Sequence, residues 1–167
     1  MARGARGAGS TGSTPAVLAL TRAGVAFTER PYAHDPRAPS YGLEAAEALG
    51  VDPTRVLKTL LASVDGSLVV AVVPVTAHLD LKALARLRGG RRAAMADPAD
   101  AERATGYVVG GISPLGQRRR HPTVVEATAL DHDQVLVSGG RRGLDVELAP
   151  ADLVRLTGAT TGPVSRW

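Results

Sequence analysis

The strongest constraint on the fold is a pair of long apolar runs that meet at Asp65-Gly66. Residues 56–64 (VLKTLLASV) and 67–75 (SLVVAVVPV) are almost continuously apolar, and each has the length of a strand. Because Asp-Gly favours the tight turn of a hairpin, the sequence predicts two antiparallel strands over residues 56–75. Both runs are too apolar to face water, so we expect this hairpin at the centre of a sheet.

The rest of the chain mixes helices and strands without regular β-α alternation. Cap residues, prolines and terminal glycines predict helices within residues 15–23, 43–50, 80–89, 97–106 and 150–158. Further strands are predicted within residues 25–32, 91–96, 123–127, 134–138 and 144–148, and the end of the chain is predicted to be a short tail. This order favours an α+β fold over a doubly wound sheet.

Composition indicates a globular protein. The 167 residues are enough for one domain with a substantial core, which we expect over residues 14–167, and residues 1–13 have the composition of a flexible tail. No segment approaches 18 uninterrupted apolar residues, so we expect no membrane span. The absence of cysteine excludes disulfides and protein thiol nucleophiles, and a cytoplasmic location fits it.

Lys58 interrupts the first apolar run with an ammonium group. Of the 20 lysine and arginine residues, only Lys58 and Lys82 are lysine. A lysine here has two interpretations. Its stem packs while its head reaches water, or it lines a cavity and holds a phosphate, ribose or carbonyl oxygen as a compact donor. The hydroxyl of Thr59 is a second candidate donor, although threonine is also a common strand residue.

Residues 106–116 (GYVVGGISPLG) form a glycine-rich loop with two interpretations. Adjacent glycines allow backbone N–H groups to converge on a ligand oxygen, but a tight structural loop uses the same residues. The pattern matches neither the dinucleotide-binding fingerprint nor the phosphate-binding P-loop. The loop alone therefore identifies no ligand.

Basic residues and a glycine-rich turn supply the other candidates. With a net charge of +4, a polyanionic partner and a merely solvated arginine-rich surface are both compatible with the sequence. Arg118, Arg119 and Arg120 follow the glycine loop directly, so we expect them beside any pocket there. In the turn at 138–145, Ser138 is a candidate hydrogen-bonding group and Asp145 a candidate partner for Lys58 or a substrate ammonium. The histidines show no metal-ligand spacing, so we expect no metal site and no cofactor.

Eight motifs, taken in order, resemble the YbaK/EbsC family of aminoacyl-tRNA deacylases, most closely the YbaK branch. The similarity spans about residues 14–157, and its motifs are TPAVLAL, YAHDP, VLKTLL, VAVVPV, LDLKALA, MADP, TGYVVGGISPLGQ and VSGGRRGLDVEL. The resemblance implies a compact α+β fold around a mixed, partly barrel-like sheet. It also implies kinship with the editing domain that is inserted in bacterial prolyl-tRNA synthetases.

The same resemblance assigns roles to particular residues. Lys58 corresponds to the essential lysine of the family's KT motif, which holds the 3′-terminal adenosine and the ester of the mischarged tRNA. Gly110 and Gly111 begin the counterpart of the GxxxP loop, whose N–H groups would bind the aminoacyl carbonyl. The remaining positions correspond to the pocket wall of the family, and they are Tyr32, Tyr41, Thr59, Ile112, Ser113, Pro114, Ser138 and Asp145.

The function implied by the resemblance is hydrolysis of mischarged Cys-tRNA(Pro) in trans, beside prolyl-tRNA synthetase. In the YbaK branch the cysteine thiol of the substrate attacks its own ester, so neither a protein nucleophile nor a metal is needed; the activity is lyase-like if cyclisation releases the tRNA. Two alternatives remain open from the residues. One is a deacylase for another mischarged tRNA, such as Ala-tRNA(Pro) or Ser-tRNA, and the other is a nucleotide- or RNA-binding module without turnover.

Overall fold

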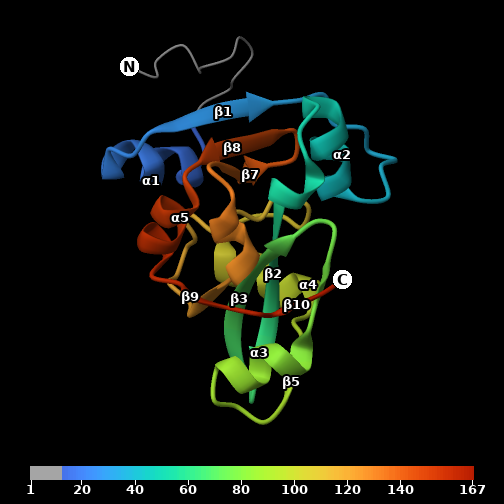
Figure 1. Ribbon diagram of the computed structural model, residues 1–167, viewed down its shortest axis with the longest axis vertical. Helices are drawn as coiled ribbons and strands as arrows, with labels where there is room; N and C mark the ends of the chain where they lie inside the picture. Colours follow the sequence, from blue (N-terminus) through green and yellow to red (C-terminus); the bar gives the residue numbers. More distant parts are fainter. Residues whose placement is uncertain (1–12) are drawn as a thin grey trace.

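The computed structural model describes residues 13–167, so almost all of the predicted tail lies outside the described residues. The helices are α1 (Pro15–Ala23), α2 (Tyr41–Leu49), α3 (Leu81–Leu87), α4 (Pro98–Thr105) and α5 (Pro150–Thr157), with short 3-10 turns η2 (Pro53–Arg55) and η3 (Ala127–Asp131). The strands are β1 (Phe27–Pro31), β2 (Leu57–Val64), β3 (Ser67–Pro74), β4 (His78–Leu79), β5 (Ala93–Met95), β6 (Thr123–Glu126), β7 (Val135–Arg141), β8 (Leu144–Leu148), β9 (Thr160–Gly162) and β10 (Ser165–Arg166). Helices and strands alternate irregularly along the chain (Figure 1).

The predicted hairpin forms the middle of a five-stranded sheet. Strand order is β5-β2-β3-β6-β9, with β2 antiparallel to β3 from the Leu57–Pro74 pair to the Val64–Ser67 pair. At the turn, Asp65 and Gly66 both have positive φ (49° and 86°), the backbone geometry that a tight two-residue hairpin requires. The sheet is mixed, because β6 runs parallel to β3 and β9 runs parallel to β6.

Two smaller sheets complete the strand pairing. β8 lies between β1 and β7, antiparallel to both, and β10 pairs with β4. Figure 1 shows β2 and β3 running lengthwise, with the β1-β8-β7 sheet at one end of the molecule and α3 and β5 at the other. The described strands form separate sheets and no closed barrel, and the expected α+β class is confirmed.

The prediction of a short tail at the end of the chain is wrong. β9 extends the central sheet and β10 pairs with β4. Between them Val164 is fully buried and donates its backbone N–H to Oε1 of Glu126 at 2.9 Å. Strands of two or three residues are too short to show a period of two, so their pairing depends on partners distant in sequence.

The helix boundaries follow their caps. Side chains of Thr14, Ser40, Asp80 and Asp97 accept backbone N–H groups at the starts of α1, α2, α3 and α4. α2 begins two residues before the predicted segment, because Ser40 rather than Gly42 precedes the first helical residue.

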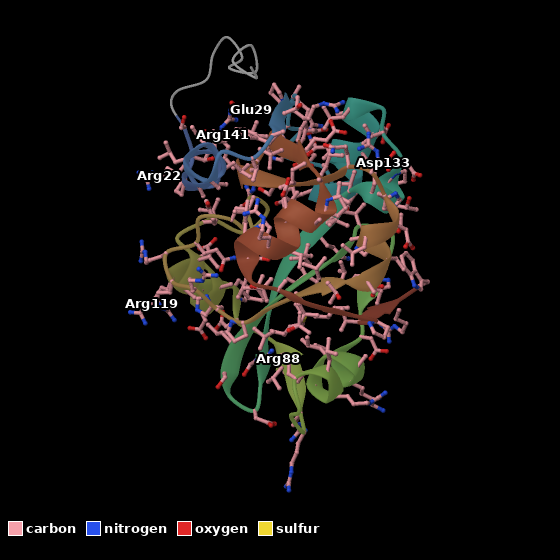
Figure 2. The ribbon with its side chains drawn as sticks, turned by 60° about the vertical axis from the view of Figure 1, so that its left-hand side comes forward. Arg22, Glu29, Arg88, Arg119, Asp133 and Arg141 are labelled. Atoms are coloured by element: carbon pink, nitrogen blue, oxygen red, sulfur yellow. The ribbon has the colours of Figure 1, made fainter. Side chains whose placement is uncertain are left out.

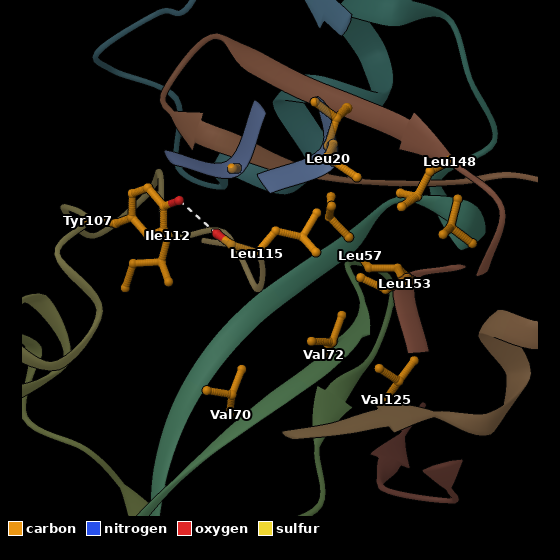
Figure 3. Close-up of a cluster of buried hydrophobic side chains, with 14 of the residues drawn as sticks. Leu20, Leu57, Val70, Val72, Tyr107, Ile112, Leu115, Val125, Leu148 and Leu153 are labelled. Atoms are coloured by element: carbon orange, nitrogen blue, oxygen red, sulfur yellow. Dashed lines mark hydrogen bonds between the residues drawn. The ribbon is translucent and has the colours of Figure 1, made fainter. Parts of the chain in front are cut away.

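The central hairpin has a hydrophobic cluster on each face, as its apolar sequence predicted. On one face, Leu57, Leu61, Val70 and Val72 pack with buried residues of α1, β7, β8 and α5 (Figure 3). On the other face, a second cluster comprises Ala62, Val64, Val69, Ala71 and Val73 together with Leu79, Leu84, Val124 and Val164. Both faces of β2 and β3 are therefore covered, which fixes the position of the residues that β2 carries.

None of the helices within residues 13–167 has the length and apolar character needed to cross a membrane.

Candidate functional site

A cavity of about 310 Å³ opens beside the first half of β2. Its walls come from β2, the start of α2, the segment after β5, the glycine loop and the β7-β8 hairpin. Most of the residues predicted for the site line this cavity: Lys58, Tyr32, Tyr41, Thr59, Gly110, Ile112, Ser138 and Asp145. Segments separated by more than 100 residues in sequence are thus brought together by the central sheet.

Gly111, Ser113 and Pro114 do not line the cavity. The Gly111 N–H is already donated to the carbonyl of Val108 at 2.9 Å, and the Gly111 carbonyl accepts the Ser138 hydroxyl at 3.1 Å. Ser113 is fully buried and its Oγ accepts the Leu115 N–H at 3.2 Å, whereas Pro114 lines a second cavity. Gly111 and Ser113 hold the loop in shape through these hydrogen bonds. A direct contact with the substrate was expected for all three residues, and the geometry does not favour it for any of them.

The cavity lies where β2 loses one of its neighbours. β5 pairs only with Ala62–Val64, and the last bond from that segment joins the Ala96 N–H to the Leu61 carbonyl at 3.0 Å, whereas the next pairing, with β7, is the bridge between Val56 and Leu136. Because alternate residues of a strand present their backbone groups to the same edge, the N–H and C=O of Thr59 point to this unpaired edge. The Thr59 hydroxyl is also buried and has no hydrogen-bond partner among the described residues. An edge with unused polar groups is therefore available to a ligand.

Lys58 is half-buried at the wall of the cavity. It takes part in none of the ion pairs found within residues 13–167, which involve Arg30, His34, Arg55, Arg103 and Arg155 instead. Burial lowers the pKa of the Lys58 ammonium, since the charged form loses contact with water. The lysine therefore presents an uncompensated donor to the cavity.

Asp145 is the buried acid of the site. Its residue surface is 6% exposed, and burial raises the pKa of its carboxyl to about 7, although the charge of Arg30 acts in the opposite direction. The expected ion pair between Asp145 and Lys58 is absent from the described residues, so that part of the interpretation is wrong. The strand register explains why: Asp145 lies opposite Arg30 on β1 and opposite Ser138 on β7, and Lys58 belongs to another sheet.

Tyr32 borders the same acid. Burial, and next the negative charge of Asp145, raise the pKa of the Tyr32 phenol to about 12. The phenol thus stays protonated at neutral pH and can donate a hydrogen bond inside the cavity.

Arg142 joins two walls of the cavity, a role that the sequence did not indicate. Its guanidinium lies 4.8 Å from the centre of the Tyr41 ring and donates to the Val109 carbonyl from Nε at 3.1 Å and from Nη2 at 2.5 Å. Gly110 sits beneath this contact with φ of 92°, and a Cβ there would lie 2.6 Å from Arg142 Nε and 2.8 Å from the Tyr41 ring. Only glycine fits this position. No local pattern marks Arg142, because its partners are more than 30 residues away in sequence.

The three consecutive arginines lie elsewhere. Arg119 and Arg120 line a second cavity of about 190 Å³ with residues of α1 and α5, and they are not at the wall that carries Lys58. They therefore lie beside a cavity formed with Pro114, Leu115 and Gly116 at the end of the glycine loop, and not beside Lys58, because the chain turns from Ile112 to Pro114 and leaves the Lys58 cavity before it reaches them.

Apolar residues that the sequence did not single out complete the cavity. Met95 is 50% exposed and Val109 is 36% exposed, and both belong to the lining. Within residues 13–167, no group of three or more histidine, aspartate or glutamate side chains could hold a metal ion. The site is thus an apolar pocket with a few converging polar groups, the common design of a small-ligand site.

Comparison with known proteins identifies the family. A family model described as the aminoacyl-tRNA editing domain matches residues 36–156. An Enterococcus faecalis (strain ATCC 700802 / V583) protein named "Putative Cys-tRNA(Pro)/Cys-tRNA(Cys) deacylase EbsC" is 40% identical over 113 residues, covering 67% of this chain and 69% of that protein. A Bacillus subtilis (strain 168) protein, "Uncharacterized protein YwhH", is 29% identical over 111 residues, covering 66% of this chain and 70% of that protein.

The solved structures agree. A crystal structure described as "a putative trans-editing enzyme for prolyl tRNA synthetase" superposes with a TM-score of 0.80 at 25% identity, covering 90% of this chain and 94% of that one. Six of the eight motifs that carry the resemblance lie wholly within the residues matched by the family model; TPAVLAL and most of YAHDP precede them. The chain therefore belongs to the aminoacyl-tRNA editing domain family, to which the YbaK and EbsC proteins belong.

Proposed function

We propose that this protein is a trans-acting deacylase of Cys-tRNA(Pro), and that Lys58 holds the aminoacyl ester in the cavity beside β2. The observation that carries the proposal is the Lys58 ammonium, which forms no ion pair among residues 13–167 and lies at the wall of the cavity. Gly110 and the edge of β2 at Thr59, which β5 does not cover, line the same cavity. The name of the Enterococcus faecalis relative supports the substrate, and the description of the solved structure supports action beside prolyl-tRNA synthetase.

Lys58 and the glycine loop would act on the ester carbonyl. When the ester is attacked, negative charge grows on the carbonyl oxygen, and donors already fixed around that oxygen lower the barrier. Lys58 supplies a positive charge in a partly dehydrated pocket, where its field is stronger than in water. Gly110 brings backbone without a side chain of its own to the cavity wall, beneath Arg142 and Tyr41, whereas the N–H of Gly111 is committed to Val108.

The attacking group would come from the substrate, since the chain contains no cysteine. In this step the cysteine sulfur forms a bond with its own ester carbonyl carbon, and the bond from that carbon to the ribose oxygen breaks. The thiol proton passes to the departing ribose hydroxyl, which leaves a cyclic thioester for water to open. The protein's contribution is then to orient the ester and exclude competing geometries.

Asp145 would bind the α-amino group of the aminoacyl ester. It is a buried carboxyl in the cavity wall, and the only charge that acts strongly on its pKa, that of Arg30, does not suppress the effect of burial. An incoming ammonium group would supply the missing counter-charge, which favours the ionised acid. The Thr59 hydroxyl is positioned to accept or donate a further hydrogen bond.

The test is hydrolysis of a panel of charged tRNAs by wild-type protein. We expect turnover of Cys-tRNA(Pro), little turnover of Ala-tRNA(Pro), Ser-tRNA and Pro-tRNA(Pro), and none of a Cys-tRNA(Pro) whose thiol has been methylated. Rapid hydrolysis of the methylated ester would exclude attack by the substrate thiol. Preferred hydrolysis of the alanyl or seryl ester would reassign the substrate, and salt-sensitive tRNA binding without hydrolysis would make the protein a binding module. Adding prolyl-tRNA synthetase to the assay, with an unrelated synthetase as control, tests action beside that enzyme.

Lys58→Ala tests the role of the lysine within the same assay. Loss of one oxyanion donor typically lowers kcat by about 100- to 1,000-fold, and we expect a loss of that order. Arg22→Ala is the matched control, because it also removes one positive charge but lies exposed at the end of α1 (Figure 2). If both variants retain wild-type rates, the assignment of Lys58 is wrong.

A further inference from the structure

A dense group of cations lies at the end of the molecule formed by α3 and β5. Five side chains within eleven residues are exposed, and together they define the α3–β5 basic surface: Lys82, Arg86, Arg88, Arg91 and Arg92. None of them takes part in the ion pairs found within residues 13–167. Lys82 and Arg86 are four residues apart on α3 and so share one face of the helix, opposite the buried Leu84.

The acidic residues around this surface have other partners. Asp80 caps α3 through the Ala83 N–H at 3.0 Å, and Asp97 caps α4 through the Ala99 N–H at 3.0 Å. The carboxylate of Asp65 accepts the backbone N–H groups of Arg91 and Arg92 at 2.9 and 3.0 Å. These contacts use the backbone N–H groups of Arg91 and Arg92 and leave both guanidinium groups without an ion pair among residues 13–167.

The α3–β5 basic surface is continuous with the rim of the Lys58 cavity. Arg92 directly precedes β5, and β5 ends at Met95, which lines the cavity together with Ala96 and Pro98. Met95 is three residues after Arg92 along the strand, a distance of about 10 Å. This is close to the Debye length at physiological salt, about 8 Å, so charges at the cavity mouth still feel the nearest arginines.

The other basic cluster lacks this connection. Arg119 and Arg120 line the second cavity between α1 and α5. Figure 2 shows Arg88 and Arg119 on separate parts of the molecule, Arg88 in the lower half of the view and Arg119 at its left edge. The two clusters can therefore be tested against each other.

We propose that the α3–β5 basic surface binds the phosphate backbone of the RNA whose aminoacylated 3′ end occupies the Lys58 cavity. The proposal rests on the proposed function for the identity of the bound ester. Guanidinium groups match phosphate oxygens in pairs, and unpaired cations release condensed counterions from RNA when they bind it. Contacts of this kind orient the nucleic acid without reading its sequence. The surface would thus deliver any acceptor end to the cavity, and the chemistry of the ester would select among them.

The experiment compares two variants with the same loss of charge. Arg88→Gln/Arg91→Gln/Arg92→Gln removes three cations from the α3–β5 basic surface, and Arg118→Gln/Arg119→Gln/Arg120→Gln removes three from the other cluster. Binding of fluorescently labelled tRNA without an attached amino acid is measured by fluorescence anisotropy over a series of salt concentrations. For the first variant we expect the slope of log K against log salt to fall by about 2 to 3, and for the second by less than 1.

If the slope of log K against log salt fell equally in both variants, only net charge would matter, and the proposal would be overturned. An unchanged slope in the first variant would overturn it as well. A third variant, in which the same three residues are replaced by lysine, keeps the charge and should keep most of the slope. If the lysine variant lost the slope although its circular dichroism spectrum matched that of the wild type, this would also contradict a phosphate contact.

Hydrolysis separates this proposal from the proposed function. With Cys-tRNA(Pro), the first variant should raise KM about 10-fold or more and leave kcat within about twofold, because three phosphate contacts are lost while the cavity is intact. With a minimal cysteinyl ester of adenosine, which has no RNA backbone, the variant should match the wild type. Wild-type protein that binds tRNA through this surface but cleaves neither ester would refute the proposed function alone. Cleavage of Cys-tRNA(Pro) with an unchanged KM in the variant would refute the surface alone.

Discussion

Lys58 is placed where its charge costs stability and serves no structural contact among the described residues. Its ammonium is half-buried, burial lowers its pKa, and it has no carboxylate partner within residues 13–167. Such a residue is destabilising unless a ligand uses it, which is a common property of functional sites.

Lys58→Met should therefore increase stability while it abolishes activity. Methionine keeps an unbranched stem of similar length in the apolar wall and removes the dehydrated charge, so we expect the Tm to rise by a few degrees. Thermal unfolding followed by circular dichroism measures this, with Arg22→Met as the control for lost net charge. A fall in Tm would mean that the ammonium stabilises the fold through a contact absent from this structure.

Asp145 should titrate near neutral pH. Its pKa is raised to about 7 by burial, and Arg30 pulls it down. The chemical shift of the Asp145 carboxyl carbon, followed by nuclear magnetic resonance from pH 4 to 9, should therefore give a midpoint near 7. Arg30→Gln should move that midpoint higher, since it removes the opposing positive charge.

The control for this titration is Arg55, at the end of η2. Arg30 also pairs with Glu147, which keeps a second partner in Arg55 at 2.7 Å. Arg55→Gln thus perturbs the same carboxylate without removing the charge that acts on Asp145. An Asp145 midpoint below 5 in the wild type would contradict the effect of burial.

At the scale of elements, the glycine loop depends on close packing as well as on backbone conformation. Gly110 has φ of 92°, and its missing side chain leaves room for Arg142 and Tyr41. Gly24 has a similar conformation at the end of α1, with φ of 69°, but a Cβ there would meet nothing within 4 Å. Comparing substitutions at Gly110 and Gly24 therefore separates the energetic cost of the backbone conformation from the cost of the steric clash.

Gly110→Ala should lower deacylation far more than Gly24→Ala does. Both substitutions force alanine into a left-handed conformation at a cost of about 1–2 kcal/mol. Only the first also displaces Arg142 from the Val109 carbonyl and Tyr41 from the cavity wall. We measure kcat/KM and Tm for both variants. Gly24→Ala should lower the Tm by the conformational cost alone, whereas Gly110→Ala should lower the Tm further because of the clash and should also lose kcat/KM selectively. Equal kcat/KM in the two variants would remove the loop from the site.

How well each element could be predicted depended on how local its determinants are. The hairpin of β2 and β3 was predictable, because an Asp-Gly turn and two apolar runs are all it needs. α1, α3 and α4 were predictable from their caps. β9 and β10 were missed, since their few residues become strands only through β6 and β4.

The same distinction applies to the candidate site. Lys58, Thr59 and Asp145 were singled out by residue type and by resemblance to a family, and the fold brings them to one cavity. The contact of Arg142 with Tyr41 was not predicted, because it joins segments about 100 residues apart. Arg119 and Arg120 lie beside the end of the glycine loop as expected, but they face the second cavity and not the Lys58 cavity, which the sequence could not distinguish.

At the scale of the whole molecule, buried carboxyl groups with opposite shifts set how stability depends on pH. The pKa of Asp145 is raised by burial, so its acid form is favoured in the folded state. The pKa of Glu126 is lowered: burial alone would raise it, but hydrogen bonds from residues that include Thr128 and Val164 outweigh burial. Glu147 is lowered in the same way by its bonds to Arg55 and Arg30, again against the effect of burial.

These shifts predict a stability maximum at weakly acidic pH, far from the sequence pI of about 10.1. Between the unfolded value of about 3.9 and the folded value near 7, folded Asp145 holds more proton than unfolded Asp145, so stability falls as the pH rises, by at most about 1.4 kcal/mol per pH unit. Glu126 and Glu147 contribute stability above their unfolded pKa of about 4.3 and lose it as the pH falls through their lower folded values. Stability therefore falls on both sides of a maximum between about pH 4 and 5: toward higher pH because of Asp145, and toward lower pH because of Glu126 and Glu147.

Thermal unfolding of wild type and Asp145→Asn from pH 3 to 8 tests this profile. Each kcal/mol moves the Tm of a chain of this size by about 2–4 °C, so the effect is readily measured. Asparagine keeps the shape of the side chain and cannot ionise, hence the Tm of the variant relative to the wild type should rise steadily from pH 4 to 7 and then level off. The effect of overall net charge on the Tm is nearly the same in the two proteins, so it cancels when the Tm of the wild type is subtracted from that of the variant. Curves that stay parallel across the range would show that Asp145 ionises as readily in the folded chain as in the unfolded one. The carboxylate would then already have water or a counter-charge, which would contradict the proposal that a substrate ammonium group supplies the missing one.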